Sequence, residues 1–135
     1  MDTVTLVNKY IDDGERLIKQ LPQEGFEVTA AFWLKASEDD EWDFYLVSPV
    51  VEAEGLAQAY RQLHPLIRRM PQPFWLDPLE VKLIGPADPI AQDVLGVQSR
   101  AGGPPGYPIR WGGKKLGNVS IEEAYFYPLP GVVPG

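Results

Sequence analysis

The sequence that decides the fold lies between residues 26 and 70, where two apolar segments flank an acidic turn and an amphipathic segment follows. Residues 26–35 read FEVTAAFWLK, residues 42–47 read WDFYLV, and the turn between them reads ASEDDE. Aromatic and β-branched residues on both sides of a turn-like segment are typical of a β-hairpin. With the turn centred on residue 39, the hairpin would pair Trp33 with Tyr45 and Lys35 with Asp43.

This register predicts two sheet faces of different character. One face would hold only apolar side chains, those of Val28, Ala30, Phe32, Leu34, Trp42, Phe44 and Leu46. We expect that face to be core. The opposite face mixes Trp33 and Tyr45 with Lys35 and Asp43, which suits a surface that is partly covered, or covered only when a partner binds.

The rest of the chain supplies helices and further strands. Apolar residues recur at steps of three and four over residues 3–20 and 50–70, which predicts two helices. We expect Pro22 to end the first helix and Pro65 to kink or break the second. Residues 79–84, 109–111 and 121–127 are predicted strands, and Asp88-Pro89 is a helix start that leads to about Arg100. The large apolar side chains of residues 74–76 are expected to pack on the core.

The resulting order, α-β-β-α-β-α-β-β, predicts an α+β fold with a mixed sheet of about five strands and about three helices. A single domain is expected over residues 1–127, followed by a Pro/Gly-rich tail over residues 128–135. If strands 42–47 and 79–84 are parallel neighbours, the helix between them crosses the apolar hairpin face. We do not expect three helices of modest length to cover both faces of the sheet.

Composition excludes several functions. The chain has no cysteine, so it forms no disulfide, thiolate metal site or cysteine nucleophile. Its net charge of −7, from 12 basic and 19 acidic residues, argues against binding to nucleic-acid phosphates. The N-terminal sequence lacks the pattern of a signal peptide, and no apolar run is long enough to cross a bilayer. We therefore expect a cytoplasmic protein with no membrane association.

Aromatic residues provide the leading functional prediction. Trp33, Tyr45, Trp111 and Tyr125 lie in predicted strands, where a shared sheet face would present them together. Such a face would either pack against a helix in the core or form a protein interface, where aromatic side chains are favoured anchors. The sequence therefore predicts a small non-enzymatic binding or accessory protein, such as a regulator or inhibitor. Its partner would be another protein or a second copy of the chain in a homo-oligomer, with no cofactor and no bound metal.

One short motif supports a different class of function. Glu80 and Lys82 are spaced as the E-x-K element of metal-dependent nucleases, in which a carboxylate holds Mg²⁺ and an ammonium helps to position the attacking water. Such a site needs a further acid on a neighbouring strand, and Asp43 is the candidate. A Mg²⁺-dependent hydrolase or nuclease is therefore the alternative prediction.

Overall fold

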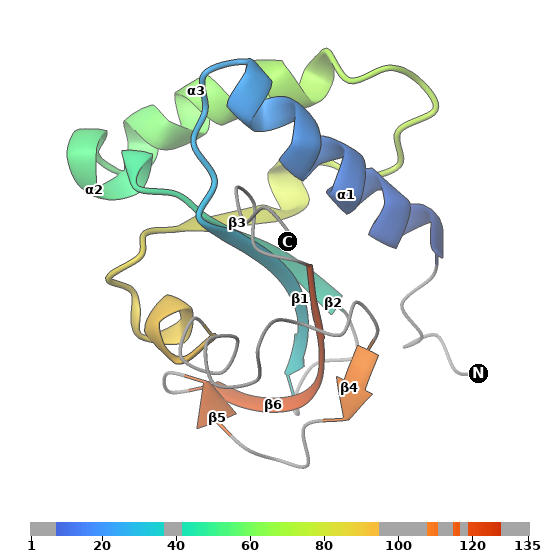
Figure 1. Cartoon of the computed structure of the whole chain (residues 1–135), viewed down its shortest axis with the longest axis vertical. Coiled ribbons are helices and arrows are strands. Elements are labelled where there is room, and N and C mark those ends of the chain that lie inside the picture. Colours follow the sequence, from blue (N-terminus) through green and yellow to red (C-terminus); the bar gives the residue numbers. More distant parts are fainter. Residues whose placement is uncertain (1–7, 37–41, 95–107, 111–114, 117–118, 128–135) are drawn as a thin grey trace, which may run out of the picture.

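A computed structural model describes residues 8–36, 42–94, 108–110, 115–116 and 119–127 of the chain, and Figure 1 shows their arrangement. A curved mixed sheet lies at the centre. Its strands follow the order β3-β2-β1-β6-β4, and the short strand β5 pairs with β6. The α+β class and the mixed sheet predicted from the sequence are confirmed.

The elements have the following bounds. The helices are α1 (Asn8–Gln23), α2 (Val50–Glu54), α3 (Leu56–Arg68) and the one-turn 3₁₀-helix η1 (Pro78–Glu80). The strands are β1 (Ala30–Ala36), β2 (Trp42–Val47), β3 (Val81–Ile84), β4 (Pro108–Arg110), β5 (Lys115–Leu116) and β6 (Val119–Phe126). Residues 89–94 are also helical, directly after the predicted start at Asp88. The acidic turn over residues 37–41, Trp111, the predicted continuation of that helix to about Arg100 and the tail over residues 128–135 lie outside the described residues.

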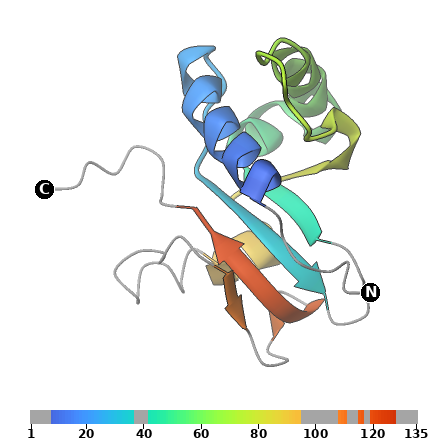
Figure 2. The same ribbon diagram turned by 90° about the vertical axis from the view of Figure 1, so that its right-hand side faces the viewer.

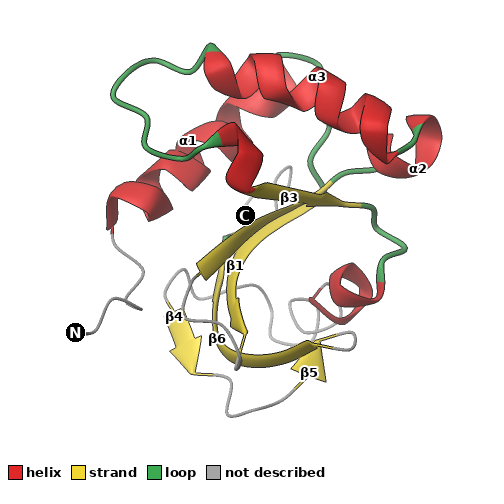
Figure 3. Ribbon diagram, turned by 180° about the vertical axis from the view of Figure 1, so that it is seen from behind, coloured by secondary structure: helices red, strands yellow, loops and turns green. Residues whose placement is uncertain are grey.

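Helices lie on both faces of the sheet (Figures 2 and 3). On one face, α1 and α3 enclose a core built from Leu17, Ile18, Leu21, Ala31, Trp33, Phe44, Leu46, Ala59, Leu63, Ile67, Val81, Leu83, Tyr125 and Tyr127. On the other face, the helical residues 89–94 close a smaller core of Ala30, Phe32, Leu34, Val47, Ala91, Val94, Ile121 and Ala124. The expectation that one face would stay without a helix is therefore wrong.

The hairpin itself is confirmed, but its predicted register is wrong by one residue. Trp33 pairs with Phe44, Phe32 with Tyr45, and Lys35 with Trp42. Because residues directly opposite one another share a face, Trp33 and Phe44 lie under α1 and α3, whereas Phe32 lies on the opposite face. Both faces of β1 are buried, so the shift leaves no large apolar side chain of β1 in solvent.

The predicted helix over residues 50–70 is divided at Gly55 rather than at Pro65. Gly55 has a φ of +92°, which a right-handed helix cannot include and which glycine adopts without steric cost. Helix α3 then continues through Pro65, whose ring is exposed, to Arg68. The first helix likewise includes Pro22 in its last turn and ends before Gly25, which has a φ of +87°.

Strand β3 lies parallel to β2 at one edge of the sheet, as the crossover through α3 requires. The Tyr60 hydroxyl from α3 accepts a hydrogen bond from the Leu83 amide at 2.9 Å and donates to the Val81 carbonyl at 3.4 Å. These two backbone groups would otherwise be available to an added strand. Tyr60 therefore occupies the hydrogen-bonding groups of the β3 edge.

Candidate functional site

The residues of the predicted aromatic interface do not form one exposed face. Trp33 is 4% exposed and Tyr125 is 8% exposed, both under α1. Tyr45 is half-buried on the opposite face, where it stacks on Phe32 with ring centroids 5.4 Å apart. The register of the hairpin is the reason, because it turns Trp33 and Tyr45 to different faces. The expectation of an exposed Trp33 surface is therefore wrong.

Trp33 and Tyr127 form a buried polar contact beneath α1. The Trp33 indole N–H donates to the Tyr127 hydroxyl at 2.9 Å, and that hydroxyl donates to the Ile11 carbonyl at 2.7 Å. Burial raises the pKa of Tyr127 above its ordinary value. A Cβ on Gly14 would lie 2.2 Å from the same hydroxyl oxygen, so glycine is what allows α1 to approach Tyr127 this closely.

The residues of the alternative hydrolase site are only partly brought together. The Lys82 ammonium lies 3.2 Å from the Asp43 carboxylate and 5.7 Å from the centre of the Tyr45 ring. Glu80 is exposed and ends the 3₁₀-helix η1, one residue before β3 begins. In the described ranges of the chain, no three side chains of the metal-binding types are grouped around a possible metal position. The Asp43–Lys82 contact is thus an ion pair on the sheet surface.

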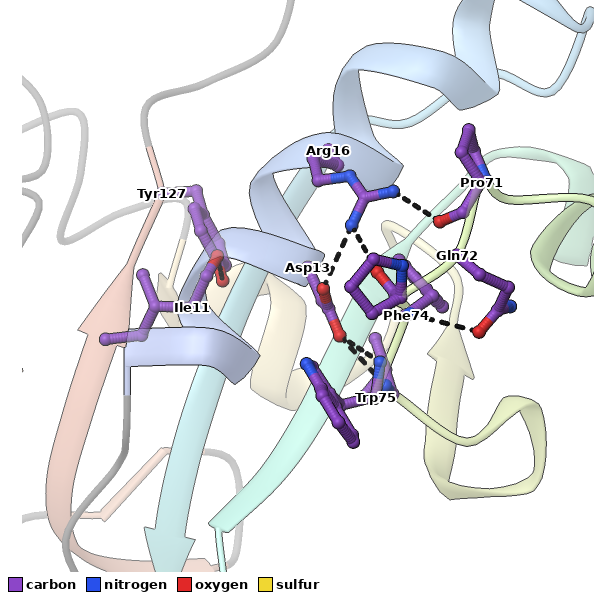
Figure 4. A network of polar contacts seen from close by, with 10 residues as sticks. Ile11, Asp13, Arg16, Pro71, Gln72, Phe74, Trp75 and Tyr127 are labelled. Atoms are coloured by element: carbon purple, nitrogen blue, oxygen red, sulfur yellow. Dashed lines mark hydrogen bonds and ion pairs between the residues drawn. The ribbon is translucent and has the colours of Figure 1, made fainter.

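A different site emerges where the segment after α3 meets α1 (Figure 4). Asp13 is 3% exposed, and its carboxylate accepts hydrogen bonds from the backbone amides of Trp75 and Leu76, the latter at 3.0 Å. A buried carboxylate is stabilised only when such donors satisfy it. The segment containing Trp75 is therefore attached to α1 by a buried charge and its hydrogen-bond partners.

Arg16, one helical turn after Asp13, binds the same segment further upstream. Its guanidinium donates to the Pro73 carbonyl at 2.9 Å and to the Pro71 carbonyl at 2.6 Å, and it lies 3.3 Å from the Asp13 carboxylate. The guanidinium also lies over the Phe74 ring, 5.3 Å from its centre. Because arginine presents several donors in a rigid plane, it holds two carbonyls and one carboxylate at the same time.

Trp75 projects from this fixed segment into solvent. Its neighbour Leu76 is buried, as expected from the sequence, and Phe74 is half-buried, but Trp75 itself is 54% exposed. The Lys9 ammonium of α1 lies over the indole, 4.4 Å from the ring centre. Leu79, four residues further along the chain, is 78% exposed. We refer to Trp75 together with Lys9 as the Trp75 surface.

The sequence contains a signal for this site that our sequence-based interpretation missed. Asp13 lies at helical spacing from the core residues Leu17 and Leu21, so a carboxylate occupies the apolar stripe of α1. A charged side chain in such a stripe requires a buried partner. The position of that partner, 62 residues away, follows only from the tertiary structure.

Comparison with known proteins does not assign the chain to a group. No family model, curated protein sequence or solved structure matches it. In the part of the chain that the structure describes, no helix has the length and apolarity to cross a bilayer.

Proposed function

We propose that this chain is a small non-enzymatic binding or accessory protein of the cytoplasm that contacts a protein partner through the Trp75 surface. The proposal is based on two observations about Trp75, namely that its backbone is fixed and that its side chain is exposed. The backbone at Trp75 is held by the buried Asp13 carboxylate, while half of the indole surface remains in solvent.

This combination favours binding for a physical reason. A tryptophan buries a large apolar area when a partner covers it, and it is over-represented among interface residues that dominate the binding free energy. Ordering a flexible segment on binding costs free energy. Because Asp13 and Arg16 already order the segment before Trp75, the partner meets a preformed surface.

The proposal moves the contact surface from the sheet to the segment after α3. The class of function predicted from the sequence is retained, but Trp33 and Tyr125 are replaced by Trp75 because the Trp75 side chain is exposed. The Mg²⁺-dependent alternative has weaker support, because the Lys82 ammonium already pairs with the Asp43 carboxylate.

The test is capture of partners from an extract of the native host with the full chain immobilised. Trp75→Ser is compared with wild type and with Leu56→Ser, a matched variant that removes another exposed apolar side chain, 49% exposed, at the start of α3. We expect a protein that wild type and Leu56→Ser retain and that Trp75→Ser loses. Retention of the same proteins by Trp75→Ser contradicts the proposal. Sedimentation of the purified chain establishes whether a second copy is the partner.

A further inference from the structure

Charged residues on α1 are divided between its two sides. Lys9 and Arg16 lie against the segment that carries Trp75, where Arg16 neutralises Asp13 at 3.3 Å. Asp12 and Glu15 lie toward β6 instead, where their charges add to burial in raising the pKa of Tyr125. Helix α1 therefore presents basic side chains toward Trp75.

Helix α3, which precedes the Trp75 segment in the chain, carries basic residues as well. Between Glu54 and Asp77 the sequence contains Arg61, Arg68 and Arg69 and no acidic residue. Arg69 pairs with Glu24 at 3.3 Å, whereas Arg61 and Arg68 make no ion pair among the described residues. The stretch of sequence that leads to Trp75 is therefore basic.

Lys9 is the cation closest to the exposed indole. It is exposed, and within the described part of the chain its ammonium contacts the rings of Trp75 and Tyr10 but no carboxylate. The nearest acid along the segment is Asp77, whose carboxylate accepts a hydrogen bond from the Leu79 amide at 2.9 Å and caps η1. The Asp13 carboxylate behind Trp75 is buried and paired with Arg16, so the exposed charge that lies against the indole is the Lys9 ammonium.

We propose that the partner binds the Trp75 surface with an acidic segment, in which carboxylates flank an apolar side chain. The apolar side chain would cover Trp75, and a carboxylate would pair with Lys9. This inference rests on the proposed function and names the chemistry of its partner. The overall charge of −7 does not oppose such binding, because salt at physiological concentration screens exposed charges beyond about 8 Å.

Three synthetic peptides test the inference directly. The first has a Phe-Leu centre with three Asp or Glu residues on each side, the second has the same centre with Lys flanks, and the third has the acidic flanks around Gly-Ser. Binding to the full chain is measured from the indole N–H signal of Trp75 in NMR spectra, which Trp75→Ser assigns. We expect the first peptide to bind about tenfold more tightly than either of the others, and to weaken as salt is raised.

Two charge reversals on α1 provide a matched pair of variants. Lys9→Glu and Lys19→Glu change the net charge equally, but Lys19 pairs with Glu15, which lies on the side of the helix away from the Trp75 segment. An acidic residue near the N-terminus of a helix is compatible with folding, so Lys9→Glu should remain folded. We expect Lys9→Glu to weaken binding of the first peptide about tenfold and Lys19→Glu to change it less than about twofold.

Three results would each overturn the inference: equal affinity for the acidic and basic peptides, equal effects of the two reversals, or no binding of the acidic peptide with the apolar centre. The outcome for the proposed function can be distinguished from the outcome for this inference. If Trp75→Ser loses the captured host protein while the acidic peptide does not bind, the surface is a contact site for a partner of other chemistry. If Trp75→Ser loses nothing, the contact site itself is wrong.

Discussion

Two tryptophans on opposite sides of α1 differ in what the helix does for them. Trp33 is buried, and its indole N–H is satisfied by Tyr127, whose hydroxyl also binds the α1 backbone at Ile11. Trp75 is hydrogen-bonded to α1 through its backbone amide, which donates to Asp13, while its ring lies beside Lys9 and is left about half in solvent. The first arrangement stabilises the core, and the second presents a side chain. Both residues are tryptophans. They differ in whether the side chain or the backbone is fixed beside α1, and this difference decides whether the ring is buried or exposed.

The largest effect is expected from Trp33→Ser. The change removes a buried ring and leaves the Tyr127 hydroxyl without its indole donor, which should cost about 4 kcal/mol of unfolding free energy in urea. Trp33→Phe keeps most of the ring and should cost markedly less. If Trp33→Ser lowers the free energy of unfolding by under about 0.5 kcal/mol, Trp33 behaves as a surface residue and the comparison between the two tryptophans is wrong.

Asp13→Ala should have the next largest effect. It leaves the buried amides of Trp75 and Leu76 without an acceptor and removes the carboxylate beside Arg16, at a cost of about 3 kcal/mol. Asp12→Ala, a change of the same type at an exposed position of α1, should stay within about 0.5 kcal/mol of wild type. Similar costs for the two variants would show that the buried carboxylate does not hold the segment.

Gly14→Ala should cost about 1 to 2 kcal/mol, even though alanine favours a helix more than glycine does by up to about 1 kcal/mol. The added methyl group would overlap the Tyr127 hydroxyl, which is fixed by two hydrogen bonds. A double-mutant cycle with Tyr127→Phe provides the control, because removal of the hydroxyl should reduce the cost of Gly14→Ala. Additive costs would contradict the close approach of α1 to Tyr127.

The core side of α1 was predictable only in part, and the reason is physical. The hairpin residues and the apolar stripe of α1 are evident in the sequence, and both are confirmed. The register of the hairpin was not evident in the sequence, because five consecutive residues of β1 are all buried, namely Ala30, Ala31, Phe32, Trp33 and Leu34. A strand that is buried on both faces carries no alternation from which its orientation can be read.

The side of α1 that contacts the segment carrying Trp75 was less predictable still. The sequence indicates that residues 74–76 contain large apolar side chains, but not which of them points outward. The side chain that points outward is determined by Asp13 and Arg16, whose hydrogen-bond partners in the segment lie 55 to 63 residues away in the sequence. Contacts at such separation leave no local pattern. The exposed Trp75 therefore required the structure, whereas the α+β class did not.

High pH should have a smaller effect, a loss of stability on the side of α1 where Tyr127 is buried. Burial raises the pKa of Tyr127 in the folded chain above the ordinary tyrosine value of 10.0. The contribution of this group to stability is therefore complete below pH 10 and is lost as pH rises above that value, where the unfolded chain loses the phenol proton first. Wild type should lose stability above pH 10 more steeply than Tyr127→Phe in urea titrations. Parallel pH profiles would contradict the buried, neutral state of Tyr127.

The central claim is that Trp75 belongs to a contact surface and not to the core. The most direct measurement is the amount of host partner retained by Trp75→Ser relative to wild type, at equal concentrations of folded protein. Because the ring is exposed, the unfolding free energy of the variant should stay within about 0.5 kcal/mol of wild type. The account predicts loss of most of the retained partner with the fold intact. Full retention of the partner, or unfolding of the variant, would contradict it.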